Sequence, residues 1–359
     1  MAAAAEIMIQ KKRITISISQ VAPLIGLDNY GNFPRIVSEL WRKYNPVEFR
    51  EFELRLKSAG HALANSSEMN DIWEADELLG TNILEKVKSL NSNTEKTSSD
   101  MTKSQAMISE YITQQSGITS DKKAELIKKV CSITNKSHGV TNEDAILDEF
   151  CKLSGKTIQG TQGWVEIPIS KSTSTSTSTS KIIFTPGTST TISGNIELEW
   201  VLVGKYDGIT MDSELVEAKM RQKGLFKSMR DYENVQVQLY MHALGFKNGF
   251  LVEGFSKATT RKKKNAKDTS DTKLDKTEKV EKAELVLYTH EISYDASYVE
   301  EIILARLVAF TRYFGDLMAD STRKENILKS NPNEWKMYLE EYLEIPYRLK
   351  FETVTQLDF

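Results

Sequence analysis

Alternating hydrophobic and polar positions mark the central part of the chain. The segment 196–209, IELEWVLVGKYDGI, is rich in β-branched and aromatic residues and predicts a strand that ends at Asp207-Gly208. The segment 214–220, ELVEAKM, predicts a second strand, and a turn between the two completes a hairpin. Two further strands are predicted at 249–255 and 283–292, where apolar residues again dominate.

Helical spacing of apolar residues predicts the other elements. Residues 14–90 read as mostly helical, and a helix is expected from near Thr141, with Glu143 on the same face as its inward apolar stripe. Residues 232–245 predict a helix closed by Gly245, and 298–318 predict another that covers one face of the sheet. The pattern favours an α/β fold with a mixed central sheet flanked by helices.

Changes in composition suggest three parts and two long insertions. Residues 1–90 form an N-terminal helical part, 91–125 a polar linker with two short helices, and 126–359 the core. The Ser/Thr-rich run KSTSTSTSTSK, residues 171–181, is the expected hairpin tip between predicted strands at 164–169 and 182–185, and a flexible loop is expected over 171–193. The lysine-rich segment 257–282 is expected to be a second such loop.

Charge and cysteine content narrow the function classes. The net charge is −3 and the sequence pI is about 6.0, so any nucleic-acid contact must come from local basic patches. One basic patch begins at the end of the second predicted strand and continues beyond it. A second basic run, 261–264, is more typical of a solvated loop. Cys131 and Cys151 belong to no zinc or iron–sulfur pattern, and we expect buried thiols. The basic patch comprises Lys219, Arg221, Lys223, Lys227 and Arg230.

Targeting signals and membrane spans are not expected. The basic residues of the opening segment MAAAAEIMIQKKR follow its short apolar stretch, the reverse of a secretory signal. No apolar run approaches the length of a membrane span. We therefore expect an intracellular protein without a membrane partner.

Two acids and a lysine form the candidate chemical site. Glu217 and Lys219 are two residues apart on a strand, so their side chains share one face. The predicted hairpin brings the carboxylate of Asp207 beside Glu217. Close carboxylates repel each other, and a divalent cation with oxygen ligands, Mg²⁺ or Mn²⁺, removes that cost. Glu/Lys alternation on a strand is common and usually reflects solvation or cross-strand pairing. The upstream Asp207-Gly208, and Gln236 and Gln238 on the next predicted helix, favour a metal site instead.

These segments resemble a known family. The order SHGVTNEDAILDEF, YDGITMDSELVEAKM and NVQVQLYMHALG is similar to the phage lambda exonuclease and YqaJ-like viral recombinase branch of the PD-(D/E)XK nucleases. The segment 14–32 looks like the N-terminal segment of that family, near the bound DNA end. About half of the chain takes part in the resemblance, which implies a restriction-endonuclease-like core.

The resemblance implies a role for each matched position. Asp207, Glu217 and the backbone carbonyl of Ala218 would bind the metal, with Glu143 as the outer acid. Lys219 would orient or deprotonate the attacking water, and Gln238 would hold the lysine or the nucleophile in place. Two sets of residues would contact DNA: Ser17 and Ser19 at a terminal phosphate, and Arg221, Lys223, Lys227 and Arg230 in the basic patch.

The expected activity is that of a Mg²⁺-dependent DNA exonuclease, acting 5′ to 3′ on linear duplex DNA in recombination, repair or replication of a viral genome. The expected place is the host cytoplasm, at a viral replication site, or the nucleus. A structure-specific endonuclease or junction resolvase on the same fold stays open, as does a catalytically vestigial DNA-binding or host-interaction protein. A homo-oligomer and a single-strand annealing or replication partner also stay open. An iron–sulfur nuclease is disfavoured by the cysteine count.

Overall fold

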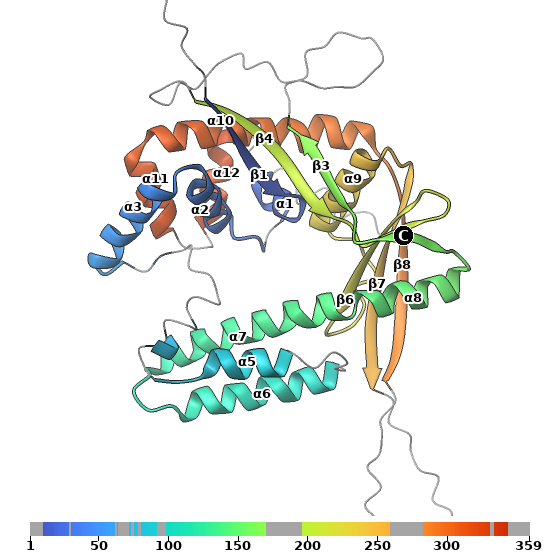
Figure 1. Cartoon of the computed structure of the whole chain (residues 1–359), viewed down its shortest axis with the longest axis horizontal. Helices are drawn as coiled ribbons and strands as arrows, with labels where there is room; N and C mark the ends of the chain where they lie inside the picture. The colour runs from blue at the N-terminus through green and yellow to red at the C-terminus, as the bar shows by residue number, and fades with distance from the viewer. Residues whose placement is uncertain are drawn as a thin grey trace, which may run out of the picture.

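The computed structural model describes residues 10–28, 30–61, 63, 72, 75–77, 80–91, 98–169, 196–258, 283–330 and 334–343. Its strands are β1 Gln10–Ser17, β2 Ile158–Thr161, β3 Trp164–Pro168, β4 Ile196–Lys205, β5 Gly208–Thr210, β6 Leu215–Arg221, β7 Asn248–Ala258 and β8 Ala283–Ser293. Its helices are η1 Ile18–Gln20, α1 Val21–Leu24, α2 Phe33–Tyr44, α3 Pro46–Ser58, α5 Ile83–Asn91, α6 Ser98–Gln114, α7 Ser120–Thr141, α8 Glu143–Ser154, α9 Asp231–Leu244, η2 Tyr298–Leu304, α10 Ala305–Ala319, α11 Ser321–Lys329 and α12 Trp335–Leu343 (Figure 1).

Two sheets organise the strands. The first has the order β1-β4-β3, with β1 parallel to β4. The second has the order β2-β5-β6-β7-β8, in which β6 and β7 are parallel and the other neighbours antiparallel. A parallel pair needs a crossover connection, and α9 supplies it between β6 and β7. The predicted α/β fold with a mixed sheet and flanking helices is confirmed, with the strand, helix, strand order expected of a restriction-endonuclease-like core.

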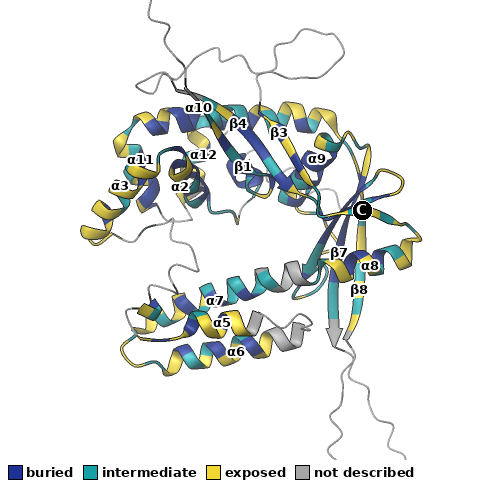
Figure 2. Ribbon diagram, viewed as in Figure 1, coloured by how far each residue is buried: buried dark blue, intermediate teal, exposed yellow. Residues whose placement is uncertain are grey.

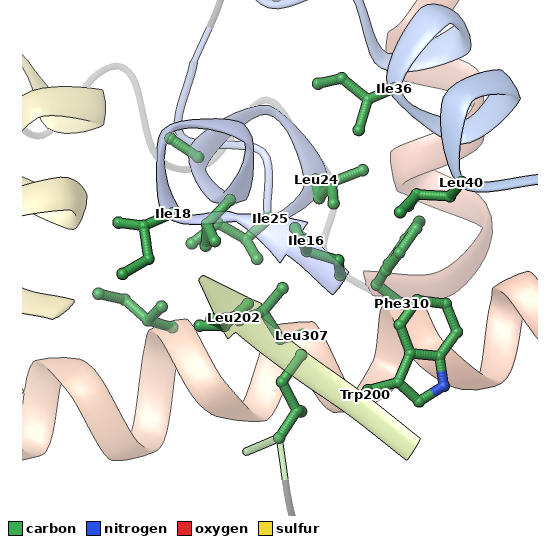
Figure 3. Close-up of a cluster of buried hydrophobic side chains, with 14 of the residues drawn as sticks. Ile16, Ile18, Leu24, Ile25, Ile36, Leu40, Trp200, Leu202, Leu307 and Phe310 are labelled. Atoms are coloured by element: carbon green, nitrogen blue, oxygen red, sulfur yellow. The ribbon is translucent and has the colours of Figure 1, made fainter. Parts of the chain in front are cut away.

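The main core joins the first sheet to the helices around it. Trp200 on β4 packs its ring edge against Phe310 and Phe314 of α10, and Ile16 of β1 is fully buried beside them (Figure 3). A second cluster joins Ile146 and other apolar residues of α8 to one face of the second sheet. Helix α9 contacts β6 and β7, and its side chains reach the opposite face. The second sheet is therefore covered by α8 on one side and in part by α9 on the other.

Helices α5, α6 and α7 lie side by side and enclose a hydrophobic cluster of their own, distinct from the main core (Figures 1 and 2). Its fully buried members include Ile83, Ile112 and Leu126. Because these residues come from all three predicted parts of the chain, the predicted boundaries after residues 90 and 125 fall inside one packed unit. The linker helices are also longer than expected, and 98–104 belongs to α6.

Other predictions can be compared with the described residues. Residues 14–17 belong to β1 rather than a helix, and α8 starts at Glu143 with Asn142 at its N-cap rather than Thr141. The helix closed by Gly245, which has φ 69°, is confirmed, as are β7 and β8. The strand at 164–169 pairs with β4; residues 182–185 and the two insertions, apart from 257–258 in β7, lie outside the described residues.

Two predictions concern single residues and the membrane. Cys131 and Cys151 are free thiols and half-buried, less enclosed than expected. None of the described helices combines the length and the apolar character that spanning a lipid bilayer requires.

Candidate active site

A bend in one antiparallel ribbon positions Asp207. Strands β2 and β3 run beside β5 and β4, and both sides of this ribbon are interrupted at 162–163 and 206–207. Gln162 has φ 58°, and a Cβ at Gly163 would lie 2.0 Å from the hydroxyl of Tyr206, so the ring closes over a residue that must be glycine. The chain leaves the first sheet at Lys205 and enters the second at Gly208. The predicted single strand is thus two strands, and Asp207 lies between them.

The bend aims Asp207 at the backbone of the next strand. Its Oδ2 accepts a hydrogen bond from the backbone N–H of Ala218, at 2.8 Å. Strand β5 pairs with β6 only at Val216 and Leu215, so Asp207 takes the place of the next backbone partner. In an extended strand the N–H and C=O of one residue point to the same edge, which directs the Ala218 carbonyl toward the Asp207 side.

Glu217 and Lys219 share one face of β6, as predicted. The Lys219 Nζ forms an ion pair with the Glu217 Oε1. The same Oε1 accepts a hydrogen bond from the Gln236 Nε2 at 2.7 Å, so α9 contributes directly to the site. Glu217 is buried and Lys219 is half-buried. Asp207, Glu217, Lys219 and Gln236 are called the acidic cluster below.

Gln236, and not Gln238, is the glutamine of the acidic cluster. Gln238 is buried with its amide group occupied elsewhere: its Nε2 donates to the carbonyl of Ser293, and its Oε1 accepts from the N–H of Asp295, both at 2.9 Å. Residues two apart on a helix point to nearly opposite sides. The expectation that Gln238 holds the lysine is therefore wrong for this structure. Gln236 lies four residues before Tyr240 on α9, so both side chains share one face of the helix. That spacing could have indicated Gln236 from the sequence.

Tyr240 fixes α9 against the strand that leads into the site. Its hydroxyl donates to the backbone carbonyl of Lys205 at 2.8 Å. The ring lies against Gly204, where a Cβ would come within 2.7 Å of it, so the close approach depends on that glycine. Burial, and the charge of Glu217, raise the pKa of Tyr240 to about 12. Tyr240 thus keeps its proton and acts as a donor.

Excess negative charge characterises the acidic cluster. Burial raises the pKa of Glu217 to about 8, although Lys219 lowers it, and Asp207 adds to the increase. The Glu217 Oε2 is buried without a hydrogen-bond partner in the described structure. Burial acts to lower the pKa of Lys219, but the neighbouring carboxylates outweigh it and raise that pKa. Lys219 therefore stays cationic while Glu217 is incompletely compensated.

Glu143 contributes to this field from the first turn of α8. It is half-buried, and its pKa is raised to about 7 by burial and by the charge of Asp207, while Lys219 opposes the increase. The sequence placed Glu143 in a first helical turn, where carboxylates commonly balance the helix dipole. Its coupling to Asp207 adds a second role for it at the site.

The donors of the acidic cluster fit a hard divalent cation. Carboxylate and carbonyl oxygens are the ligands that Mg²⁺ and Mn²⁺ prefer, and the unpartnered Glu217 Oε2 is a buried carboxyl oxygen that a cation would satisfy. Asp207, the Ala218 carbonyl and Glu143 would be the other oxygen donors of such a site. Within the described residues no three His, Cys, Asp or Glu side chains are already gathered tightly enough to hold a metal by themselves. Water and phosphate oxygens would complete such a site, as is usual for Mg²⁺.

The predicted DNA-binding residues divide into two groups. Arg221 is buried, and its Nη2 lies 2.7 Å from Glu233 Oε1 and 2.7 Å from Glu253 Oε1, so its prediction as a DNA contact is wrong. Lys223, Lys227 and Arg230 are exposed in the loop that follows.

Ser17 and Ser19 lie near the end of the first sheet that leads to Asp207. Their hydroxyl oxygens are 2.9 Å apart, and Ser17 is paired with Val203, two residues before Lys205. Ser19 is exposed and Ser17 half-buried. The structure thus places both serines at the strand ends that lead to Asp207, while their role in phosphate binding stays a prediction.

Comparisons with known proteins give distant structural similarity alone. No family model matches the chain, and no curated protein matches it. A crystal structure of an alkaline exonuclease, LHK-Exo, from Laribacter hongkongensis aligns with 65% of this chain and 89% of its own at 13% identity and a TM-score of 0.30. The crystal structure of LHK-Exo in complex with dAMP aligns with 65% of this chain and 88% of its own, at 13% identity and a TM-score of 0.27. The crystal structure of SSO0001 aligns with 64% of this chain and 83% of its own, at 12% identity and a TM-score of 0.28.

Proposed function

We propose that this chain is a metal-dependent DNA exonuclease that hydrolyses phosphodiester bonds. The observation that carries the proposal is the acidic cluster: Asp207 and Glu217 converge beside Lys219, with a buried carboxylate oxygen left without a partner. Phosphodiesters resist attack because their anionic oxygens repel a nucleophile. A site with anionic metal ligands and one retained cation is suited to that problem.

Each group of the cluster has a proposed task. Asp207, Glu217, the Ala218 carbonyl and Glu143 would hold Mg²⁺, for which Mn²⁺ is a substitute. When bound, the metal would supply an activated water and neutralise charge that develops on the phosphate. Lys219 would offset negative charge at the scissile phosphate. Its raised pKa favours this role over that of a general base, because a base must be neutral before it accepts a proton.

Gln236 is proposed to orient Glu217. Its amide donates to the same carboxylate oxygen that Lys219 contacts, which leaves the other oxygen, Oε2, for a ligand. The resemblance noted above favours linear duplex DNA as substrate, digestion from the 5′ end, and a task in viral recombination, repair or replication. The exposed cations of the neighbouring loop favour a polyanionic substrate.

Digestion of end-labelled linear duplexes tests the proposal. Duplexes with either 5′-phosphate or 5′-hydroxyl ends and a circular duplex are incubated with the full chain, in Mg²⁺ and in EDTA, beside the Lys219→Ala variant. We expect mononucleotide release from linear DNA in Mg²⁺ alone. Cutting of the circle or of branched DNA would instead favour an endonuclease or resolvase. No cleavage of any substrate, together with retained DNA binding, would indicate a vestigial protein.

A further inference from the structure

The strand register extends the face of the acidic cluster beyond the proposed catalytic residues. Lys219 on β6 is paired with Glu253 on β7, which is paired in turn with Tyr288 on β8. Arg221, Phe255 and Val286 form the next row in the same way. Paired residues of adjacent strands project to the same side of a sheet. The face that carries Glu217 and Lys219 therefore continues to the edge strand β8.

Two aromatic rings are exposed on this continuation. Phe226 is 41% exposed and Tyr288 is 38% exposed, and both flank the fully buried carboxylate of Glu253. The backbone N–H of Phe226 donates to Glu253 Oε2 at 2.8 Å, and Tyr288 is the strand partner of Glu253. Phe226 and Tyr288 are called the aromatic platform below.

The platform is held rigidly. The centroid of the Phe226 ring lies 4.2 Å from the Arg221 Cζ and 4.7 Å from the Arg230 Cζ. Lys227 has φ 57°, and its N–H also donates to Glu253 Oε2, which holds the loop in an unusual conformation. The ring of Tyr288 meets His290 edge to face with centroids 4.9 Å apart. Rings fixed in this way lose little freedom when a flat ligand stacks on them.

Positive charge surrounds the platform. Lys223, Lys227 and Arg230 are exposed in the loop that carries Phe226, and the half-buried Lys219 lies on the same sheet face. Exposed acidic groups lie at the margins, with Asp231 at the start of α9 and Glu284 at the start of β8. Exposed rings combined with backbone-binding cations are the features by which proteins hold single-stranded nucleic acid.

We propose that the aromatic platform binds a single-stranded DNA segment through base stacking, next to the acidic cluster. The proposal rests on the proposed nuclease function for its choice of DNA, and it adds a strand-holding surface to that function. Lys223, Lys227 and Arg230 contact the phosphates, and Phe226 and Tyr288 stack on bases. Because every base has a flat face, the surface is tolerant of sequence.

Binding in a non-hydrolysing background tests this surface. The Lys219→Ala full-length chain is titrated against fluorescein-labelled single-stranded DNA of about 15 nucleotides, within the site sizes of such surfaces, and Kd is measured by anisotropy. Phe226→Ala and Tyr288→Ala should each weaken binding by about 5- to 100-fold, the range for loss of one stacked base. Phe226→Tyr and Tyr288→Phe should retain it, and Phe226→Leu should not, because leucine keeps the apolar bulk without the ring.

Charge and sugar chemistry provide two further arms. Lys223→Ala and Lys227→Ala should each reduce the salt dependence of Kd by about one counterion while leaving sequence tolerance unchanged. The same oligonucleotide made as RNA should bind less tightly than the DNA, and tighter RNA binding would overturn the choice of DNA. Alanine variants of Phe226 and Tyr288 that melt like the parent and bind DNA equally tightly would overturn the platform itself.

The platform and the nuclease proposal fail separately. If the parent hydrolyses DNA while the aromatic substitutions leave Kd unchanged, the platform is refuted and the nuclease is retained. If the aromatic substitutions weaken binding while the parent releases no nucleotides in Mg²⁺, the nuclease is refuted and the binding surface is retained.

Discussion

Two buried charge clusters lie side by side on one face of β6, and they differ in charge compensation. In the acidic cluster with its outer acid Glu143, three carboxylates face one lysine. The second cluster is called the arginine network and consists of Arg221, Glu233 and Glu253, two carboxylates around one guanidinium.

Within the arginine network Glu253 is the well-satisfied carboxylate, while Arg221 Nε and Glu233 Oε1 are buried without a hydrogen bond in the described structure, although Arg221 and Glu233 form an ion pair. Glu253 accepts hydrogen bonds from Arg221, from the N–H of Phe226 and from the N–H of Lys227. Burial acts to raise the pKa of Glu253, but these bonds outweigh it and leave the pKa lowered. Glu217 has a raised pKa and an unpartnered oxygen instead.

The difference separates residues that hold the fold from residues available for chemistry. Loss of one partner of a buried ion pair is strongly destabilising. A buried carboxyl group with a raised pKa and an open oxygen is instead a candidate for chemistry. The four predictions below start with the largest expected effect.

Removal of the charged side chain, Arg221 or Lys219, should have different consequences in the two clusters. Arg221→Met leaves two buried carboxylates without their guanidinium and should lower the free energy of unfolding by roughly 3–5 kcal/mol. Lys219→Met should leave the melting temperature near that of the parent, because Glu217 can take up a proton, and should reduce kcat by about 100- to 1,000-fold. Urea unfolding and nucleotide release measure the two effects. Equal loss of stability in both variants would contradict the distinction.

Neutralising one carboxylate in each cluster repeats the comparison with smaller changes. Glu253→Gln removes a charge-assisted hydrogen bond to Arg221 and should destabilise the fold by about 2 kcal/mol. Glu217→Gln replaces a carboxyl group that holds a proton below about pH 8 and should change stability by less than about 1 kcal/mol at neutral pH, while Mg²⁺ binding is lost. Calorimetry of unfolding and of Mg²⁺ titration gives both numbers. Mg²⁺ binding unaltered in Glu217→Gln would remove that residue from the proposed ligand set.

The two glutamines of α9 offer a matched pair of substitutions. Gln236→Ala deletes a hydrogen bond to a charged carboxylate, which contributes about 1.5–3 kcal/mol, so kcat should fall about tenfold or more with a modest change in stability. Gln238→Ala deletes two backbone contacts and should lower stability by about 1–2 kcal/mol with kcat close to the parent value. The reverse pattern in steady-state kinetics and thermal melts would restore Gln238 as the glutamine of the site.

The pH dependence of stability in EDTA should report the excess charge. The pKa of Glu217 rises from an ordinary 4.5 to about 8 in the folded chain, so the folded state holds a proton that the unfolded chain releases. This stability is fully present below pH 4.5 and is lost as the pH rises through about 8. Glu143 acts in the same direction, with its pKa raised to about 7.

The slope is measured above pH 6.5 so that titration of His242 contributes little to it. The pKa of His242 is lowered from 6.5 in the folded chain, so its titration makes stability rise with pH. Denaturant unfolding in EDTA should show stability falling toward pH 8, with the Glu217 proton contributing at most about 1.4 kcal/mol per pH unit. Glu217→Gln should remove most of that slope, while Glu253→Gln should keep it. A slope that persists in Glu217→Gln would assign the proton to another group.

Local pattern predicted the residues that share a face within one element. Period-two alternation placed Glu217 and Lys219 on one side of β6, and the structure pairs them. Sequence analysis assigned Arg221 to a basic patch that contacts DNA, whereas the structure extends β6 to Arg221 and buries it as a partner of Glu233 and Glu253. Period-two alternation predicts the face of the strand to which a side chain points, but it does not predict the partners of that side chain. Its partners come from α9 and β7, and no pattern within β6 describes them.

The bend at Asp207 shows the same limit. Sequence reasoning read 196–209 as one strand because its residues favour extended backbone throughout, and the backbone is indeed extended on both sides. The break depends on the Tyr206 ring closing over Gly163, a contact between residues far apart in the chain. The backbone hydrogen bonds Tyr206 N–H to Gly163 O and Gln162 N–H to Asp207 O join the same two segments where β4 ends and β5 begins.

The sequence by itself determined the α/β class, the α9 helix with its glycine cap, and the acid and lysine that share one face of β6. Tertiary structure decided which glutamine reaches Glu217, which cation is buried, and how Asp207 reaches the backbone of Ala218. The physical reason is range. Strand and helix periods act over a few residues, whereas the compensation of a buried charge depends on every element packed against it.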